Sequence, residues 1–338
     1  MKKIFSIGRI KVEPGQIVKG FLPTANLDMP DGTGNFWPIP VIVINGSNDG
    51  PVFEVDGAIH ADEQMGTLTV LELAKRLDPN KINGAFIGVP VLNSKAFLSK
   101  QRYYQNVNMN RVFPGDPYGS ATHRAVHTFW NEIMMKSDYT INLHGTSQVQ
   151  VPRVVFSEHT PDMSEKTLEM AKAVAYDPKW IIASKSEHTR LEHRTVNWAC
   201  AQVSKPNVFL EYGPRSYMPE DIVDPLETSI NGIFNCMKWA GVLDGRPITP
   251  KYWRMTSYYT NVRSSCSGIR YDQPCLKLNN MVNDRETLSV ITDFLGNEIE
   301  KVLSPYDGIV LMLPQDRAHT EIDEEITIVG KTPTIIKA

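Results

Sequence analysis

The chain has 338 residues, of which 41% are hydrophobic and 22% are charged, and its formal net charge at pH 7 is −3. This composition is typical of a globular protein and excludes a disordered, collagen-like or coiled-coil chain. The nearly balanced charge argues against a nucleic-acid binder, and no apolar run approaches the roughly 20 residues that a membrane span needs. At roughly 100–200 residues per domain, the length fits one large domain or two.

We expect a cytoplasmic protein from the N-terminus and the cysteine content. Lys2 and Lys3 resemble the start of a signal peptide, but charge returns at Arg9 before an apolar core of the needed length has formed. The four cysteines are too few for a disulfide scaffold, and none forms a C-x-x-C pair. We expect them to be small buried hydrophobic residues (Cys200, Cys236, Cys266 and Cys275).

Between about residues 40 and 243, short apolar runs alternate with helical patterns. The predicted strands are 40–44, 51–55, 85–92, 139–143, 180–183 and 207–210, and the predicted helices are 64–77, 121–136, 163–175, 193–203 and 219–241. Pro225 and Gly232 fall inside the last helical stretch and predict a kink or a break there. The alternation predicts an α/β fold with a mixed, largely parallel sheet and helices on both faces.

The pattern changes after Gly245. The remaining chain contains short strand-like runs, such as 308–312 and 325–329, and no long helical period. We therefore predict two domains, 1–245 with about 40 extended residues at its start, and a small all-β domain at 246–338. The sequence leaves open whether the β-domain covers the rim of an active site or supports assembly.

The strongest local feature is the segment 56–63, in which a strand ends and a glycine turns the chain toward a helix. His60 and Glu63 stand three residues apart at the mouth of that helix, so an imidazole and a carboxylate can converge on one zinc ion. Sites in open α/β sheets lie beyond the carboxyl ends of strands. Two other strand ends carry His144 and Glu211, so three strand ends each offer a metal-binding or acid/base group.

Each of these residues alone also has a plainer interpretation. A pair spaced like His60 and Glu63 is common by chance, His144 could be a hydrogen-bonded histidine at a strand end, and Glu211 could be a salt-bridge carboxylate. His123 and His127 form a rival pair on helix 121–136, but Arg124 replaces the glutamate of an H-E-x-x-H motif. The other histidines are expected at the surface or beside ligands (His159, His188, His193 and His319).

The segment 101–115 follows a predicted strand and is rich in side-chain amides and cations. Arg102 and Arg111 present planar, bidentate donors that suit carboxylates, and several asparagines accompany them. This composition indicates recognition of a polar or anionic ligand. The alternative is a structural loop whose asparagine side chains satisfy its own backbone.

Four motifs in this order resemble those of the succinylglutamate desuccinylase/aspartoacylase family, within the zinc-carboxypeptidase-like fold. The family patterns are Gly-x-x-His-Gly-x-Glu, Asp-x-Asn-Arg-x-Phe-Pro-Gly, Asp-Leu-His and Glu-x-Gly, and the matching stretches are 57–63, 108–115, 142–144 and 211–213. The resemblance covers roughly residues 40–240, and residues 304–310 resemble part of the small β-domain that follows in this family.

The chain departs from the family patterns at three positions. Ala61 replaces a glycine, and Asn108 and Asn142 each replace an aspartate, which removes negative charge near the expected site. None of the three removes a metal ligand. They therefore bear on how ligands and substrate are held.

The resemblance implies a zinc-dependent amidohydrolase that removes an acyl group from an N-acylated amino acid or a similar small amide. His60, Glu63 and His144 would bind one zinc ion per chain and leave an open position for water. Zinc lowers the pKa of its bound water to about 7 and acts as a Lewis acid. No G-x-S-x-G nucleophile motif is evident, so attack by water is the simplest mechanism.

The same resemblance implies roles for four further residues. Glu211 would be the general acid/base, a role typically worth about 10²–10⁴-fold in rate. Arg102 would polarise the scissile carbonyl as negative charge develops on its oxygen. Asn110 and Arg111 would hold a carboxylate of the small-molecule substrate.

Two alternatives to this function stay open at this stage. One is a carboxypeptidase-like peptidase that acts on short peptides, and the other is a non-catalytic metal- or ligand-binding protein of the same fold. No nucleic-acid or membrane partner is expected, and a homo-oligomer is compatible with the sequence. The acyl group, the amine partner and the pathway are left open.

Overall fold

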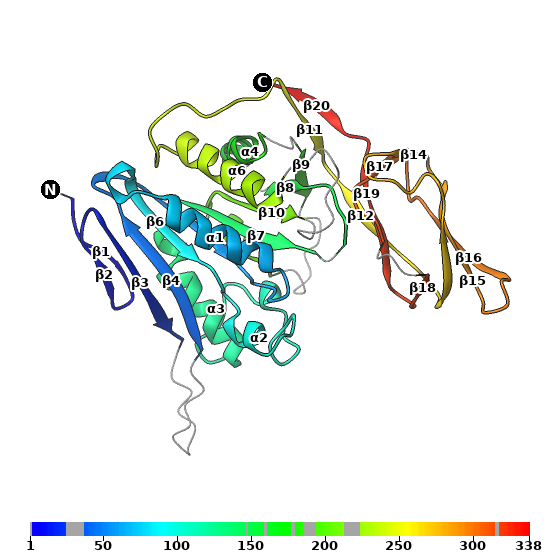
Figure 1. Cartoon of the computed structure of the whole chain (residues 1–338), viewed down its shortest axis with the longest axis horizontal. Coiled ribbons are helices and arrows are strands. Elements are labelled where there is room, and N and C mark those ends of the chain that lie inside the picture. The colour runs from blue at the N-terminus through cyan, green and yellow to red at the C-terminus, as the bar shows by residue number, and fades with distance from the viewer. Residues whose placement is uncertain are drawn as a thin grey trace, which may run out of the picture.

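The computed structural model describes residues 2–24, 37–146, 148–158, 161–176, 180–185, 194–212, 224–314 and 318–338. A ten-stranded sheet forms its centre (Figure 1). The strands of this sheet are β3 (Gln16–Pro23), β4 (Pro38–Asn45), β5 (Asn48–Gly57), β6 (Asn83–Val89), β7 (Tyr139–Gly145), β8 (Arg153–Glu158), β9 (Trp180–Lys185), β10 (Asn207–Tyr212), β11 (Tyr252–Thr256) and β20 (Thr334–Lys337).

Their order across the sheet is β20-β11-β9-β8-β10-β7-β5-β6-β4-β3, and the sheet is mixed. Five of the nine neighbouring pairs are parallel, including the central run β6, β5, β7 and β10. The carboxyl ends of these four strands therefore meet at one edge of the sheet. The predicted mixed, largely parallel sheet is confirmed.

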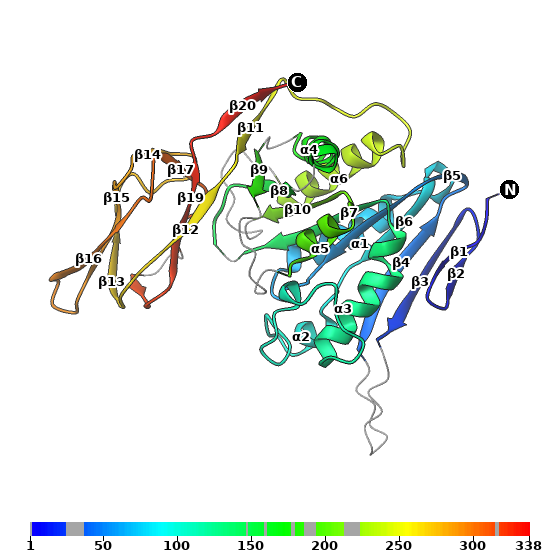
Figure 2. The ribbon, with the colours of Figure 1, turned by 180° about the vertical axis from the view of Figure 1, so that it is seen from behind.

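Helices cover both faces of the sheet, as predicted. Figure 1 shows one layer in front of the strands and Figure 2, from behind, shows the other. The first layer contains α1 (Gln64–Arg76), α4 (Pro161–Val174) and α6 (Pro225–Trp239), and the second contains α3 (Ala121–Glu132) and α5 (Val196–Gln202). The short helix α2 (Ser94–Leu98) follows β6, and a hairpin of β1 (Phe5–Ile7) and β2 (Ile10–Val12) packs its apolar residues into the second layer.

The last helical stretch is broken at Pro225, as predicted, because Asp224 before it is extended, and the helix then continues without a kink through Gly232. Pro225 occupies the first position of α6, where its missing N–H leaves no hydrogen bond unmade, and the side chain of Asp224 caps the helix. Gly232 lies inside the continuous helix, where a Cβ would come 2.7 Å from the carbonyl oxygen of Val174. This glycine therefore allows α4 and α6 to pack closely. Residues 219–223 of the predicted helix lie outside the described residues.

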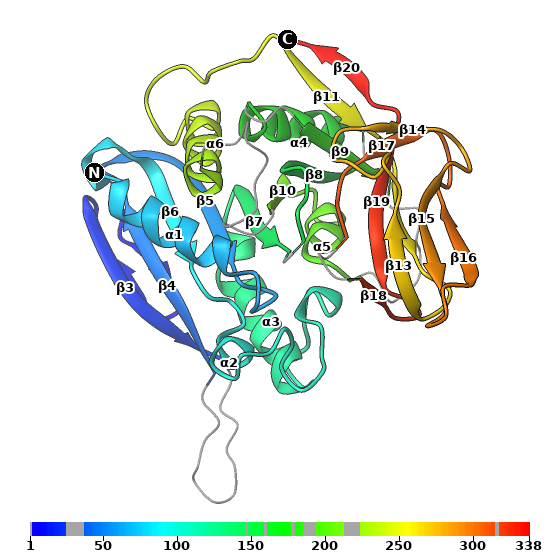
Figure 3. The same cartoon turned by 45° about the vertical axis from the view of Figure 1, so that its right-hand side comes forward.

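The C-terminal part contains two four-stranded antiparallel sheets that enclose a separate apolar core (Figure 3). We call this unit the β-sandwich. One sheet contains β12 (Tyr259–Arg263), β19 (Glu325–Lys331), β17 (Gly308–Val310) and β14 (Met281–Val282), and the other contains β16 (Glu298–Leu303), β15 (Thr287–Thr292), β13 (Gly268–Asp272) and β18 (His319–Thr320). The predicted all-β character is confirmed.

The β-sandwich is tied to the large sheet in two ways. Strands β11 and β20, which precede and follow it in the chain, extend the large sheet beside β9. An apolar cluster also joins the two units, with Val155 and Trp180 on one side and Leu311 and Ile328 on the other. The domain boundary between residues 245 and 246 stays a prediction.

Two of the four cysteines behave as expected. Cys200 and Cys236 are buried, whereas Cys266 and Cys275 in the β-sandwich are only partly buried. Among the helices that the structure describes, none is long and apolar enough to cross a membrane.

Candidate metal centre

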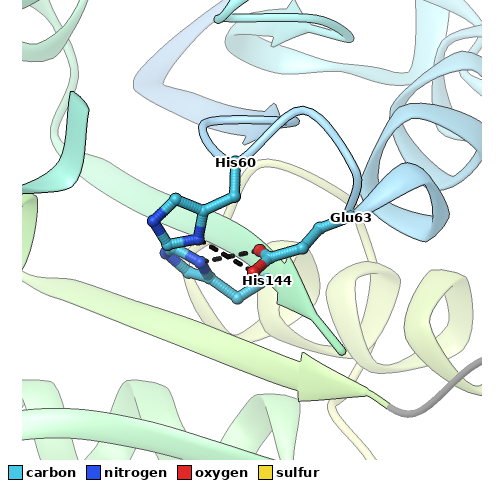
Figure 4. A group of neighbouring side chains, drawn as sticks. All are labelled: His60, Glu63 and His144. Atoms are coloured by element: carbon cyan, nitrogen blue, oxygen red, sulfur yellow. Dashed lines mark hydrogen bonds and ion pairs between the residues drawn. The ribbon is translucent and has the colours of Figure 1, made fainter. Parts of the chain in front are cut away.

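Three buried side chains converge where β5 and β7 end (Figure 4). Glu63 Oε1 lies 2.8 Å from Nδ1 of His60, and Glu63 Oε2 lies 3.0 Å from Nδ1 of His144. One ligand atom from each residue lies within 4.8 Å of the others, and the three residues are only 5–7% exposed. Two imidazoles and a carboxylate are a donor set that could hold a metal ion. We call these three residues the triad.

The local backbone explains why the triad assembles. His60 lies in the turn after β5, and Glu63 is the residue immediately before α1. A Cβ on Gly57 would lie only 2.6 Å from the carbonyl carbon of Gly66, so these two glycines let α1 begin directly against the strand ends. His144 is the next-to-last residue of β7, at the carboxyl end of that strand.

The electrostatics of the triad favour an ionised carboxylate. Burial would raise the pKa of Glu63, but the attraction of His144 and the hydrogen bonds from both imidazoles hold that pKa well below its usual range. Burial lowers the pKa of His60. Burial acts in the same direction on His144, but the charge of Glu63 raises the pKa of His144 above its ordinary value.

Asn108 fixes the orientation of the first imidazole. Its Oδ1 lies 3.2 Å from Nε2 of His60 and also accepts a hydrogen bond from the backbone of Asn110 at 2.9 Å. An amide oxygen can only accept, so Asn108 favours a hydrogen on Nε2 of His60, and Nδ1, whose hydrogen Glu63 accepts here, would be the ligand atom once a metal took the place of that hydrogen. Asn108 therefore keeps an acceptor where the family pattern has an aspartate.

Arg102 approaches the triad from its exposed side. Its Nη2 lies 2.8 Å from Oε1 of Glu63 and 3.1 Å from Nδ1 of His60, and its Nη1 pairs with Asp62 at 2.9 Å. A cationic group is thus held beside the position that a metal would occupy.

Glu211 reaches the same region from the neighbouring strand. It is the partner of His144 in the parallel ladder between β10 and β7, so both side chains project from one face of the sheet. The Nε2 of Gln150 lies 3.4 Å from Oε2 of Glu211, and Oε1 of Gln150 accepts a hydrogen bond from Arg153 at 2.9 Å.

A pocket of about 670 Å³ brings all seven sequence-predicted site residues together. The triad, Glu211 and the 101–115 segment line one side of it, and the β-sandwich supplies the other. The predicted residues are His60, Glu63, Arg102, Asn110, Arg111, His144 and Glu211, and the sandwich contributes among others Tyr259, Glu325 and Ile328. The β-sandwich therefore covers the rim of the site, which the sequence left open.

Asn110 has a structural contact within this wall. It is 7% exposed, and its Oδ1 accepts a hydrogen bond from the backbone of Val196 at 3.0 Å, at the start of α5. Asn110 therefore anchors a helix outside its own loop, whereas the Asn108 side chain bonds to the backbone of the loop itself, as the structural alternative for segment 101–115 expected.

The remaining histidines do not enter the site where they are described. Among the described residues, no third ligand completes a metal group with His123 and His127 on α3. His319 is exposed on β18. His159, His188 and His193 lie outside the described residues, as does Gly213 of the fourth motif.

The other residues that line the pocket were missed by sequence reasoning, and Gln150, Arg153 and Tyr259 are among them. Arg153 begins β8, a strand that the sequence did not predict, and Tyr259 begins β12 in the β-sandwich. Their approach to the site depends on the pairing of β8 with β10 and on the packing between the two units. A polar residue at the start of an apolar run, such as Arg153 before Val154, is the only local signal.

The fold and the triad define an α/β protein with a candidate metal centre at its strand ends. The sequence pattern of the succinylglutamate desuccinylase/aspartoacylase catalytic domain matches residues 49–238, which is more than half of the chain, and the protein belongs to this family of deacylases. The N-alpha-acetyl-L-2,4-diaminobutyric acid deacetylase of Halomonas elongata is 32% identical over 140 residues. That match spans 40% of this chain and 41% of the relative.

Solved structures share the whole fold. A succinylglutamate desuccinylase/aspartoacylase from Rhodobacter sphaeroides superimposes with a TM-score of 0.80 at 20% identity, over 97% of this chain and 100% of that one. The product-bound ectoine utilization protein EutE of Ruegeria pomeroyi gives a TM-score of 0.79 at 20% identity, over 96% and 98% of the two chains. At this identity the likeness establishes the architecture, including the β-sandwich.

Proposed function

We propose that this protein is a zinc-dependent amidohydrolase that removes an acyl group from an N-acylated amino acid or a similar small amide. The observation that carries this proposal is the buried triad at the wall of a pocket of about 670 Å³, with the Glu211 carboxylate on the adjacent strand. Membership in a family of deacylases supports it.

The donor chemistry of the triad fits zinc. Nδ1 of His60, Nδ1 of His144 and a carboxylate oxygen of Glu63 would be the protein ligands, the N/O set typical of catalytic zinc sites with one open position. A bound zinc ion would supply Lewis acidity and a water of lowered pKa, about 7. The Asn108 contact to His60 keeps the ligand atom of that imidazole pointed inward.

The other residues of the pocket would handle protons and charge. Glu211, beside His144, would take a proton from the attacking water and return it to the leaving amine. Arg102, beside Glu63, would donate hydrogen bonds to the scissile carbonyl oxygen as negative charge develops there. Arg111 and Asn110, which line the same side of the pocket, would hold a substrate carboxylate.

The curated relative suggests where to look for substrates. Its name gives N-alpha-acetyl-L-2,4-diaminobutyric acid, and we propose acetylated amino acids of this kind as the first compounds to test. The assay is a panel of N-acyl amino acids and short peptides with zinc-loaded protein. Hydrolysis of the peptides alone would identify a peptidase, and a protein without stoichiometric metal or turnover would be a binding protein.

The Glu211→Gln variant tests the assigned chemistry. We expect it to retain one zinc ion per chain and to lose about 10²–10⁴-fold in kcat, because the general acid/base is gone while the ligands remain. Glu13→Gln, at an exposed carboxylate far from the pocket, is the matched control and should retain full activity. Undiminished turnover in Glu211→Gln would contradict the assignment.

A further inference from the structure

Gln150 is the side chain that holds the carboxylate of Glu211. It is 1% exposed, and its Nε2 donates to Oε2 of Glu211 at 3.4 Å. Among the residues that the structure describes, no other group forms a hydrogen bond or an ion pair with this carboxylate. Hydrogen bonds of catalytic groups are often long before a substrate binds and shorten in the complex. The orientation of the Glu211 carboxylate therefore depends on Gln150.

The amide of Gln150 is itself fixed by Arg153. Nη1 of Arg153 lies 2.9 Å from Oε1 of Gln150, and a guanidinium can only donate, so the amide oxygen faces Arg153. The NH2 group of the amide then faces Glu211, where an ionised carboxylate can only accept. Arg153 is 5% exposed and also donates to the carbonyl of Val151 at 3.2 Å. The guanidinium thus sets the direction of the amide, and the amide sets the direction of the carboxylate.

This arrangement avoids a direct contact between opposite charges. Arg153 and Glu211 are partners in the antiparallel ladder between β8 and β10, so both side chains leave the same face of the sheet. Within the described part of the chain they form no ion pair, and Gln150 bonds to both. A direct ion pair would oppose proton uptake by the carboxylate, whereas a neutral amide orients it and leaves its charge in place.

The β-sandwich holds the backbone of Gln150. Residues 149–151 lie antiparallel to residues 311–313 of the β-sandwich, and Gln150 forms an isolated bridge with the middle residue of that segment. The backbone N–H of Val151 donates to the carbonyl of Leu311 at 2.8 Å, and a second bond of the same length joins the other ends of the two segments. The connection between the two units therefore carries the residue that contacts Glu211.

We propose that Gln150 is a positioning residue for Glu211, and that Arg153 fixes Gln150 in that role. Gln150 binds Oε2 of Glu211, which leaves Oε1 as the oxygen that exchanges a proton with the attacking water and the leaving amine. This inference rests on the proposed function, in which Glu211 is the general acid/base. A misplaced catalytic group costs rate more than it costs binding, so loss of the contact should lower kcat and spare KM.

Gln150→Met and Gln150→Glu remove the donor and keep a side chain of similar size. We expect kcat on a hydrolysed compound of the substrate panel to fall about 10–100-fold in each, with KM within about threefold of its starting value and one zinc ion per chain retained. Gln150→Glu still accepts the bond from Arg153, so its loss of kcat would place the effect at the donor to Glu211. Gln148→Met is the matched control and should keep its kcat, because Gln148 bonds to the carbonyl of Glu325 at 3.3 Å and does not line the pocket.

The Glu211→Gln background separates positioning from a structural role. If Gln150 acts through the carboxylate, adding Gln150→Met should leave the residual kcat of Glu211→Gln within about twofold. A general disturbance of the pocket would lower kcat by the same factor in both backgrounds. Arg153→Met should lower kcat less than Gln150→Met does, and combining the two should cost no more than Gln150→Met alone, because Arg153 acts through Gln150.

Crystal structures of the natural protein and of Gln150→Met give a readout that needs no turnover. We expect a single orientation of the Glu211 carboxylate in the first and a different or divided orientation in the second. An unchanged orientation, an unchanged kcat in Gln150→Met, or equal losses in the two backgrounds would each overturn the positioning role. A reoriented Glu211 in a protein that hydrolyses nothing in the substrate panel would instead refute the proposed deacylase activity and leave the contact standing.

Discussion

Glu211 and His144 face each other in the parallel ladder between β10 and β7. Paired residues of neighbouring strands project from the same face, so the backbone register by itself sets the carboxylate beside the imidazole. On its other side, Glu211 is paired with Arg153 of β8. One row across three strands thus carries a triad residue, the proposed general acid/base and the buried guanidinium of Arg153.

The contact between Asn108 and His60 should matter for metal affinity. In Asn108→Leu, Nε2 of His60 loses its acceptor and the imidazole loses its fixed orientation, so the zinc dissociation constant should rise about 10–100-fold. Competition with a chromogenic chelator measures this constant. Asn131→Leu, which removes an amide beside His127 on α3, is the control and should leave zinc affinity unchanged. Equal affinities in the two variants would contradict the role of Asn108.

Arg102 should act on the rate more than on metal content. Its guanidinium contacts Glu63 and His60, but each of these also has a partner inside the triad. We therefore expect Arg102→Met to retain its zinc and to lose about 10²–10³-fold in kcat, as removal of an oxyanion donor does. Steady-state kinetics and metal analysis measure both. Arg76→Met, which breaks an exposed ion pair with Glu227, is the control and should retain its kcat. An intact kcat in Arg102→Met would exclude polarisation of the scissile carbonyl by Arg102.

A pair of fully buried carboxyl groups beneath the site should make stability depend on pH. Glu54 and Asp56 are 0% exposed, and within the described residues neither forms an ion pair. Burial raises the pKa of Asp56 to about 7, and burial together with the nearby Asp56 raises the pKa of Glu54 well above its usual value. The folded protein therefore binds more protons than the unfolded chain between about pH 4 and 7.

The protonated carboxyl groups of Glu54 and Asp56 therefore contribute to the free energy of unfolding at the acid end of the range from about pH 4 to 7. This contribution is lost as the pH rises through their pKa values in the folded protein. Glu54→Gln removes one of the two acids, so its free energy of unfolding should exceed that of the natural protein at pH 8, on the order of 1–3 kcal/mol, and approach it at pH 5. Urea unfolding of metal-free protein measures this. The exposed Glu13→Gln should show no such pH dependence, and a Glu54→Gln difference that is the same at both pH values would refute the prediction.

The close packing of α1 on the strand ends predicts that Gly66 cannot accept a side chain. A Cβ there would lie 2.8 Å from Cβ of Leu143 and 3.1 Å from Cα of Gly57. Gly66→Ala should lower the free energy of unfolding by about 1–3 kcal/mol despite the better helix propensity of alanine, and it should weaken zinc binding by displacing Glu63. Thermal unfolding and metal titration measure the two effects. Leu68→Ala, on the exposed side of α1, is the control and should leave zinc binding intact. Unaltered zinc binding in Gly66→Ala would contradict the coupling between the packing of α1 and the position of Glu63.

The convergence of the triad could be predicted because each member stands beside a recognisable strand end. His60 and Glu63 follow an apolar run and a glycine, and His144 ends another run, so the rule that strand ends meet at one edge was sufficient. The helices and central strands were predictable for the same reason, since their apolar periods are local. Pro225 marks the predicted break in the last helical stretch, and Asp224 before it is the local signal of a helix start.

The far wall of the pocket could not be predicted from local patterns. Arg153 stands opposite Glu211 only because β8 pairs antiparallel with β10, and Tyr259 reaches the pocket only because the β-sandwich packs on the large sheet. Both contacts join segments far apart in the chain. Spacing along the sequence carries no information about such pairings.

Because the β-sandwich covers the pocket, substitutions that alter the substrate can occur on different elements from the residues that would bind the metal. Residues that would bind the metal belong to the ends of β5 and β7, whereas Tyr259, Glu325 and Ile328 stand on β12 and β19. A chimera that receives the sandwich of another family member should therefore keep its metal affinity and acquire the substrate preference of the donor. Divergence within the family can proceed through this module while the triad stays constant.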